Sequence, residues 1–194
     1  MEAKFSKRLF AYIIDIAILG LVLFLTNIII PESNDIKHLN LELDILNEQY
    51  LNQEMELKEY LYNYSEINYS LDKENIVYNI VNIVFVICYF IIMPYFLNGQ
   101  TIGKKLLKIQ VVRQDGKLTI TSLIIRNLII NGLAYMLITL LLVYTLPVHI
   151  YFIITSILSV VQLVLIIIVT MGIIKSNNEL VIHDRLGQTK VVNL

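Results

Sequence analysis

The chain has 194 residues, and its composition is too apolar for a protein that folds in water. Apolar residues make up 57% of the chain, charged residues 16%, and the mean hydropathy is +0.69, whereas soluble domains have about 45–50% apolar and about 25% charged residues. The net charge of −1 gives no excess of either sign, and the single cysteine, Cys88, excludes an internal disulfide and a zinc site built from cysteines.

Four stretches each reach the roughly 20 apolar residues that a membrane-spanning helix needs. We predict spans at Leu9–Ile30, Ile76–Leu97, Asn127–Leu146 and Val148–Ile174. The first contains one charged residue, Asp15, and the other three contain none. Only Pro147 separates the last two, which predicts a tight hairpin of antiparallel helices. The first span is longer than the apolar core of a signal peptide and no A-x-A-like site follows it, so we expect it to be retained.

The segment Pro31–Asn75 between the first two spans is acidic, with three lysines and eleven carboxylates. Apolar and aromatic residues recur at steps of three and four from Ile36 to Tyr64, and Gln53 is the one polar position in this stripe. Such spacing predicts an amphipathic helix, and the residues from Pro31 to Asn34 are typical of a helix start. The helix packs on its own neighbours or on the span ends, or it binds a partner through a short heptad-like seam.

The loop 98–126 between the second and third spans is basic and begins with two glycines, Gly99 and Gly103. Their spacing departs from that of a nucleotide-binding phosphate loop, because three rather than four residues separate them and Lys105 stands where a hydroxyl residue is needed. We therefore expect no nucleotide site. Lys104, Lys105 and Lys108 are instead expected to contact lipid phosphates.

Two runs of β-favouring residues follow, Ile109–Arg113 in this loop and Thr189–Asn193 in the tail 175–194. Asp115-Gly116 is a strong hairpin signal, and 118–120 would provide the returning strand. We expect the hairpin and the tail to form a small sheet of three strands, near the minimum for stability in water.

The basic residues indicate how the chain threads the membrane. Twelve of the fifteen lie before the first span, between the second and third, or after the fourth. Because Lys and Arg are retained on the cytoplasmic side, both termini and the loop 98–126 are expected in the cytoplasm and 31–75 outside. The expected fold class is an all-α transmembrane protein: one domain forming a four-helix membrane bundle, with an extracytoplasmic amphipathic helix and a small cytoplasmic β-hairpin or sheet.

Several dispersed residues together resemble the RDD family of bacterial membrane proteins, which is named for one arginine and two aspartates. The resemblance rests on Arg8, Asp15, the block Gly99–Leu107, Arg126, and His183-Asp184-Arg185-Leu186 with Thr189 and Val191. Arg8 and Asp15 match the first two named residues and Asp184 the third. Segment 31–75 lies outside the resemblance, and Gly187-Gln188 stands where the family often has Ala-Gly. The resemblance implies a multi-pass protein of the bacterial cell membrane, with ligand transport, including cation/proton exchange, suggested for the family.

Asp15 is the most informative single position. It lies about 10 Å along the helix from Arg8, where a carboxylate inside hydrocarbon costs about 2.5–3.5 kcal/mol and usually marks function. Two interpretations stay open. Asp15 handles a proton or a cation, or it ties helices together through Arg126 or through the amides of Asn127, Asn131 or Asn82.

Asp184 and Arg126 are the other functional candidates, together with Arg8. Asp184 lies in the tail, where it caps a turn or pairs with Arg8 or Lys105. We see no assembled catalytic residues and no metal-ligand spacing, so no enzymatic activity, metal or cofactor is expected.

Two functions remain. The first is transport through Asp15, which with four spans calls for a homo-oligomer. The second is a non-enzymatic scaffold or accessory subunit that binds a membrane partner protein through the acidic outer helix or the basic loop. The expected partners are anionic lipids on the cytoplasmic face and such a protein or second copy, with no nucleic acid.

The orientation can be tested by labelling single cysteines introduced into a Cys88→Ser chain. A cysteine between Glu42 and Tyr64 is expected to react with a membrane-impermeant maleimide in intact cells, because the lysine and arginine distribution places this region outside. A cysteine at Lys117 is expected to react only after permeabilisation. The reverse pattern, or a protein that stays soluble without detergent, would contradict the assignment.

Overall fold

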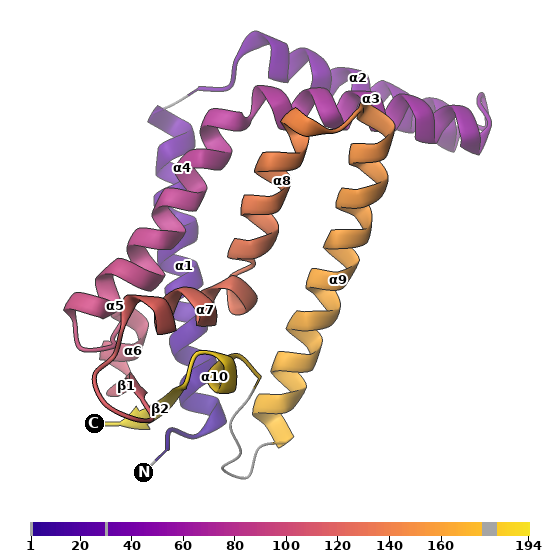
Figure 1. The fold of residues 1–194 in the computed structure, drawn as a ribbon. Helices are drawn as coiled ribbons and strands as arrows, with labels where there is room; N and C mark the ends of the chain where they lie inside the picture. Colours follow the sequence, from indigo (N-terminus) through magenta and orange to yellow (C-terminus); the bar gives the residue numbers. More distant parts are fainter. Residues whose placement is uncertain (1, 30, 176–181) are drawn as a thin grey trace.

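A computed structural model describes residues 2–29, 31–175 and 182–194, and it is mostly helical (Figure 1). In this part of the chain, three long helical stretches are apolar enough to cross a membrane, or four if one bent pair is a single span. They are α1 (Phe5–Ile29), the run from α4 (Ile76–Ile87) through η1 (Cys88–Ile92) to α5 (Met93–Phe96), α9 (Val148–Lys175), and the pair α7 (Ile120–Ile130) and α8 (Leu133–Thr145). The predicted helical membrane protein is confirmed at this level. Ile30 at the end of the first predicted span, and 176–181 of the tail, lie outside the described residues.

The prediction that the third span, Asn127–Leu146, is one straight helix is wrong. The span breaks at Asn131 and Gly132, and α7 and α8 meet at 77°. Gly132 adopts the left-handed conformation, with φ of 63°, which ends α7. The 13 residues of α8 extend only about 20 Å, less than the about 30 Å of a hydrocarbon core.

Neighbouring helices satisfy the backbone groups that this break exposes. Gln162 Nε2 of α9 donates to the carbonyl oxygen of Ile129 at 3.2 Å, and the Tyr12 hydroxyl of α1 donates to that of Ile130 at 3.4 Å. Asn131 Nδ2 donates to Asn127 Oδ1 at 2.6 Å. Broken helices are tolerated in membranes when other helices re-satisfy the freed groups in this way.

The acidic segment forms two helices rather than the single amphipathic helix that the stripe predicts. These are α2 (Asn34–Leu51) and α3 (Leu57–Glu74), which lie side by side across one end of the bundle (Figure 1). The predicted start is confirmed, because Ser33 caps α2 by accepting a hydrogen bond from the Ile36 amide. Gln53, the polar position in the stripe, has a φ of 61° and turns the chain back. The apolar stripe therefore closes on itself as a helical hairpin.

Helix α3 packs on the start of α9, in agreement with the simpler of the two interpretations of the acidic segment. Ser65 Oγ lies 2.8 Å from His149 Nδ1, and the Tyr151 hydroxyl donates to Asp72 at 2.7 Å. Tyr69 meets Tyr151 edge to face. Polar and aromatic contacts thus fix the hairpin at the end of the bundle that we call the acidic end.

At the opposite end, the basic end, the predicted pairing of loop and tail is confirmed but the Asp115-Gly116 hairpin is wrong. Strands β1 (Ile109–Arg113) and β2 (Thr189–Asn193) are antiparallel, with Val111 opposite Val191. The expected return strand is absent from the described residues because Thr119 caps α7 instead. The N-terminal segment extends the sheet, where Glu2 pairs with Val192 in an isolated bridge.

Two short helices complete the basic end, α6 (Ile102–Leu106) and α10 (Ile182–Leu186). Ile109, Val111 and Val191 of the sheet bury their side chains against Ala3 and Ala11. The sheet, the two termini and the start of α1 therefore form one packed unit (Figure 1).

Candidate functional site

Asp15 is fully buried, and three groups from two other segments donate hydrogen bonds to its carboxylate. The Tyr89 hydroxyl of η1 donates to Oδ1 at 2.7 Å, the Thr101 hydroxyl donates to Oδ2 at 2.6 Å, and the Gly103 amide donates to Oδ1 at 2.8 Å. Hydrogen bonds to a charged group contribute about 1.5–3 kcal/mol each. Asp15 therefore joins α1 to the second span and to α6.

The two glycines that begin the basic loop, Gly99 and Gly103, allow this packing. Thr101 caps α6 while it also donates to Asp15, so α6 begins against α1. A Cβ atom at Gly103 would collide with the carbonyl oxygen of Ala11 and would lie 2.8 Å from Asp15 Oδ1. Gly99 has a φ of 82°, and a Cβ there would collide with the backbone of Val111. The two glycines thus allow close approach of neighbouring backbone.

Lys104 places its ammonium group beside the same carboxylate, with Nζ 3.9 Å from Asp15 Oδ2 and 3.3 Å from the Thr101 hydroxyl. Its side chain is only 17% exposed. Burial lowers the pKa of Lys104 from 10.5 to about 8, while Asp15 opposes this shift and Arg126 adds to it. Lys104 therefore faces inward, whereas lipid contacts by Lys105 and Lys108 stay a prediction.

A second buried carboxylate, Asp184 of α10, lies between two arginines. Arg126 Nη1 of α7 donates to Asp184 Oδ1, and Arg8 Nη1 lies 3.7 Å from Oδ2. The Thr189 hydroxyl donates to Oδ1 at 3.1 Å. Burial alone would raise the pKa of Asp184, but the guanidinium groups, Arg126 foremost, and the Thr189 hydrogen bond hold it below its ordinary value. Asp184 is therefore charged at neutral pH.

Arg8 extends this second cluster to the sheet and the N-terminus. Its Nε donates to the Ala3 carbonyl at 2.9 Å, and Nη2 donates to the Val191 carbonyl at 3.3 Å. One guanidinium group thus connects α1 to the tail strand.

His183, beside Asp184, is also buried, with 1% of its surface exposed. Burial, together with the nearby guanidinium groups of Arg126 and Arg8, lowers the pKa of His183 to about 3, with Asp184 opposing. The ring is therefore neutral at physiological pH and carries one donor and one acceptor nitrogen. Its Nδ1 has no hydrogen-bond partner among the described residues.

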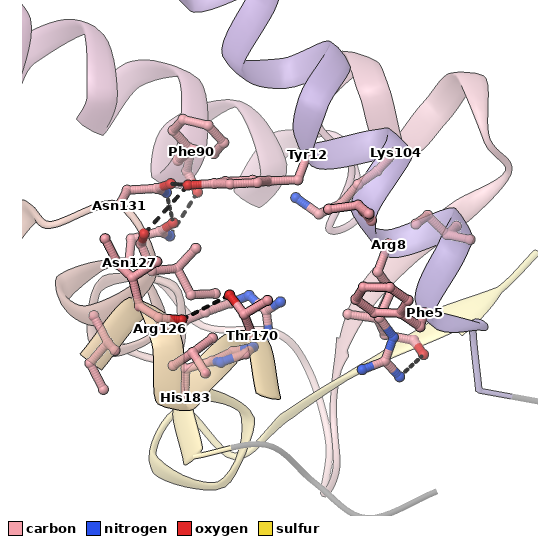
Figure 2. Close-up of a pocket in the computed structure, with 17 residues that line it drawn as sticks. Phe5, Arg8, Tyr12, Phe90, Lys104, Arg126, Asn127, Asn131, Thr170 and His183 are labelled. Atoms are coloured by element: carbon pink, nitrogen blue, oxygen red, sulfur yellow. Dashed lines mark hydrogen bonds between the residues drawn. The ribbon is translucent and has the colours of Figure 1, made fainter. Parts of the chain in front are cut away.

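A cavity of about 130 Å³ lies between these two clusters (Figure 2). Arg8, Lys104, Arg126 and His183 line it, together with apolar side chains of α1, α7 and α9. Lys104 and Arg126 reach toward it from opposite sides (Figure 2).

The sequence predicts only some of the contacts that the candidate residues make in the structure. Arg8 pairs with Asp184, one of the predicted alternatives. The predicted ties of Asp15 to Arg126 or to asparagine amides are wrong, because Arg126 is engaged with Asp184 and Tyr89 and Thr101 donate to Asp15. Thr101 lies in the glycine block that marked the loop, whereas no sequence signal singles out Tyr89.

The model of the RDD family matches residues 2–188 of the chain. No curated protein and no solved structure matches it.

The packing of α6 on α1 is tested by Gly103→Ala. We expect the variant to lose about 1–3 kcal/mol of stability, because the added methyl group overpacks the contact with Ala11 and Asp15. Thermal unfolding in detergent measures the loss. Gly20→Ala is the matched control in α1, where a Cβ atom meets no atom within 4 Å. Equal unfolding temperatures for the two variants would contradict the close approach of α6.

Proposed function

This chain belongs to the RDD family of membrane proteins, and on that premise we propose that it exchanges a cation for a proton at the pair formed by Asp15 and Lys104. The observation that carries the proposal is a carboxylate with no exposed surface beside a lysine that also borders a cavity. A buried carboxylate needs a positive partner, and a metal cation can replace an ammonium group in that role.

The groups around Asp15 have the chemistry that a hard cation requires. Hard cations such as Na⁺ and Ca²⁺ prefer oxygen ligands. Three groups present oxygens within one hydrogen-bonded cluster: the Asp15 carboxylate and the hydroxyls of Thr101 and Tyr89. While Lys104 is protonated, its ammonium group balances Asp15. After Lys104 loses its proton, a cation can balance the carboxylate instead.

The proton affinity of Lys104 is consistent with this exchange. A pKa of about 8 allows the side chain to lose its proton near physiological pH. Three charged groups act on it most strongly: Asp15 and Asp184 favour the charged form and Arg126 disfavours it. The pH therefore decides whether Lys104 carries the proton that balances Asp15.

We also propose the cytoplasmic placement of the basic end, and an oligomer of this chain as the transporting unit. Three or four candidate spans are few for a complete pathway within one copy.

Cation flux into proteoliposomes tests the exchange. The wild-type flux is expected to rise as the pH passes upward through about 8, because deprotonated Lys104 no longer competes for Asp15. Asp15→Asn keeps the shape and two acceptor contacts but removes the charge, so it is expected to abolish flux. Lys104→Gln is expected to remove the pH step, and Lys105→Gln, at an exposed neighbouring position, is expected to keep it. Unchanged flux in a folded Asp15→Asn protein would refute the proposal.

A second candidate function is a scaffold in which the hairpin of α2 and α3 associates with a second copy. The free end of the hairpin extends past α9 (Figure 1) and presents Leu51 and Leu57, which are 78% and 55% exposed. Contiguous exposed apolar patches are typical of interaction surfaces, and these two leucines flank the same turn between α2 and α3.

Deleting residues 42–64 tests this candidate. The deletion removes the free end of the hairpin together with the ring contacts of Tyr62 and Tyr64 on α9. It keeps Ser65, Tyr69 and Asp72, which also hold α3 on α9. Chemical crosslinking in membranes is expected to give a dimer with the intact chain and only monomer with the shortened one. A dimer of equal yield in both would exclude the hairpin as the contact.

A further inference from the structure

The cavity at the basic end is lined by cations and not by the carboxylates that pair with them. Arg8, Lys104 and Arg126 all border the cavity, whereas Asp15 and Asp184 do not. Lys104 contacts Asp15 and also borders the cavity, and Arg126 reaches toward the cavity from α7 (Figure 2). The positive groups therefore border the space while their carboxylates do not, and this arrangement favours an anion inside.

Arg126 has hydrogen-bonding capacity to spare beside this space. Within the part of the chain that the structure describes, its hydrogen bonds to Asp184 and Thr189 both start from Nη1. A guanidinium group has five N–H donors in a planar fork that matches a phosphate. His183 also borders the cavity, but its Nε2 lies 3.5 Å from Asp184 Oδ2. The proton of the neutral ring is therefore favoured on Nε2, and Nδ1 is an acceptor. The spare donors for an anion are those of Arg126.

An apolar groove of about 320 Å³ continues the cavity toward the middle of the bundle. The two spaces share Tyr12, Phe90, Ile130, Asn131 and Ile166. Beyond these shared residues, the groove is lined by Ile16, Leu19, Val86 and Met136, among others. A charged compartment therefore leads into a mostly apolar one, and both lie within a single bundle.

The compartments also open to the side of the bundle. Leu9, Ile166 and Thr170 line the cavity and are at the same time exposed on α1 and α9. These helices are candidate membrane spans, so the rim faces the lipid. A ligand can enter from the bilayer without crossing the sheet or α10.

We propose that the cavity and groove bind one molecule of an anionic phospholipid, with its phosphate between Lys104 and Arg126 and an acyl chain in the groove. The charged compartment lies at the basic end and the apolar one nearer the bundle centre. The phosphate and the acyl chains of a lipid in the adjoining leaflet lie in the same order. This site is separate from the cation exchange proposed at Asp15, although Lys104 borders both.

The headgroup decides the selectivity of such a site. A lipid chain that moves from the bilayer into the groove exchanges one apolar environment for another, so it adds little discrimination. Cations in an apolar setting attract a net negative headgroup, whereas a zwitterionic headgroup brings its own positive charge. Anionic phospholipids are therefore expected to bind at least 10-fold more tightly than zwitterionic ones.

Native mass spectrometry of the purified full chain in detergent tests the site without any transport measurement. The probes are dioctanoyl phosphatidylglycerol, dioctanoyl phosphatidylcholine and inorganic phosphate. We expect one phosphatidylglycerol to bind per chain, phosphatidylcholine at least 10-fold more weakly, and phosphate to compete only at much higher concentration. Equal binding of the two lipids would overturn the proposal.

Two variants locate the site, and one serves as a matched control. Arg126→Lys keeps the charge opposite Asp184 but loses the planar fork, and we expect about 10-fold weaker binding of phosphatidylglycerol. Ile166→Trp fills the region where cavity and groove join, and it is expected to abolish binding. Ile167→Trp, the next residue on α9, is 49% exposed and lines neither space, so it is expected to bind as the wild type does.

The variants also separate a lipid from a free anion. If Ile166→Trp binds phosphatidylglycerol as tightly as Ile167→Trp does, the groove holds no chain and the proposal fails. If inorganic phosphate binds as tightly as phosphatidylglycerol, the site takes a free phosphate and the lipid assignment is wrong. Neither outcome bears on cation exchange, which the flux of Asp15→Asn decides independently.

Discussion

Two buried carboxylates hold the basic end of this bundle together. Buried carboxylates are stable only when charged or hydrogen-bonding partners surround them, and the partners of Asp15 and Asp184 come from distant parts of the chain. Asp15 draws η1 and α6 onto α1, and Asp184 draws α7 and α1 onto α10. Arg8 then connects α1 to the two-stranded sheet, because it donates a hydrogen bond to the carbonyl of Val191. Loss of a partner would leave a buried charge uncompensated.

The same requirement for satisfied polar groups explains the irregular helices. The π-helical turn η1 presents the Phe90 carbonyl, which accepts a hydrogen bond from Asn127 Nδ2 at 3.0 Å, and such turns are frequent at functional sites. The break between α7 and α8 is satisfied by Gln162 and Tyr12. Because the freed backbone groups find partners within the protein, the helices can depart from straight geometry at these points.

Lys104 connects the two proposed activities of the basic end. On one side its ammonium group balances Asp15, and on the other it borders the cavity that we assign to an anionic headgroup. An anion in the cavity would favour the protonated lysine, whereas a cation at Asp15 would favour the neutral one. The two ligands are therefore expected to oppose each other, by the thermodynamic reciprocity of coupled sites.

The apolar stretches and the spaced motifs around Arg8, Asp15 and Asp184 are local features, so the amino-acid sequence was enough to identify a helical membrane protein of this family. The sequence also indicated the pairing of Ile109–Arg113 with the tail. The folded chain was needed to show that the acidic segment folds back at Gln53, that the third span breaks at Gly132, and that Tyr89 rather than Arg126 reaches Asp15. Apolar periodicity is the same in one helix and in two that fold together, and the partner of a buried charge depends on how helices pack, which no single stretch of sequence specifies.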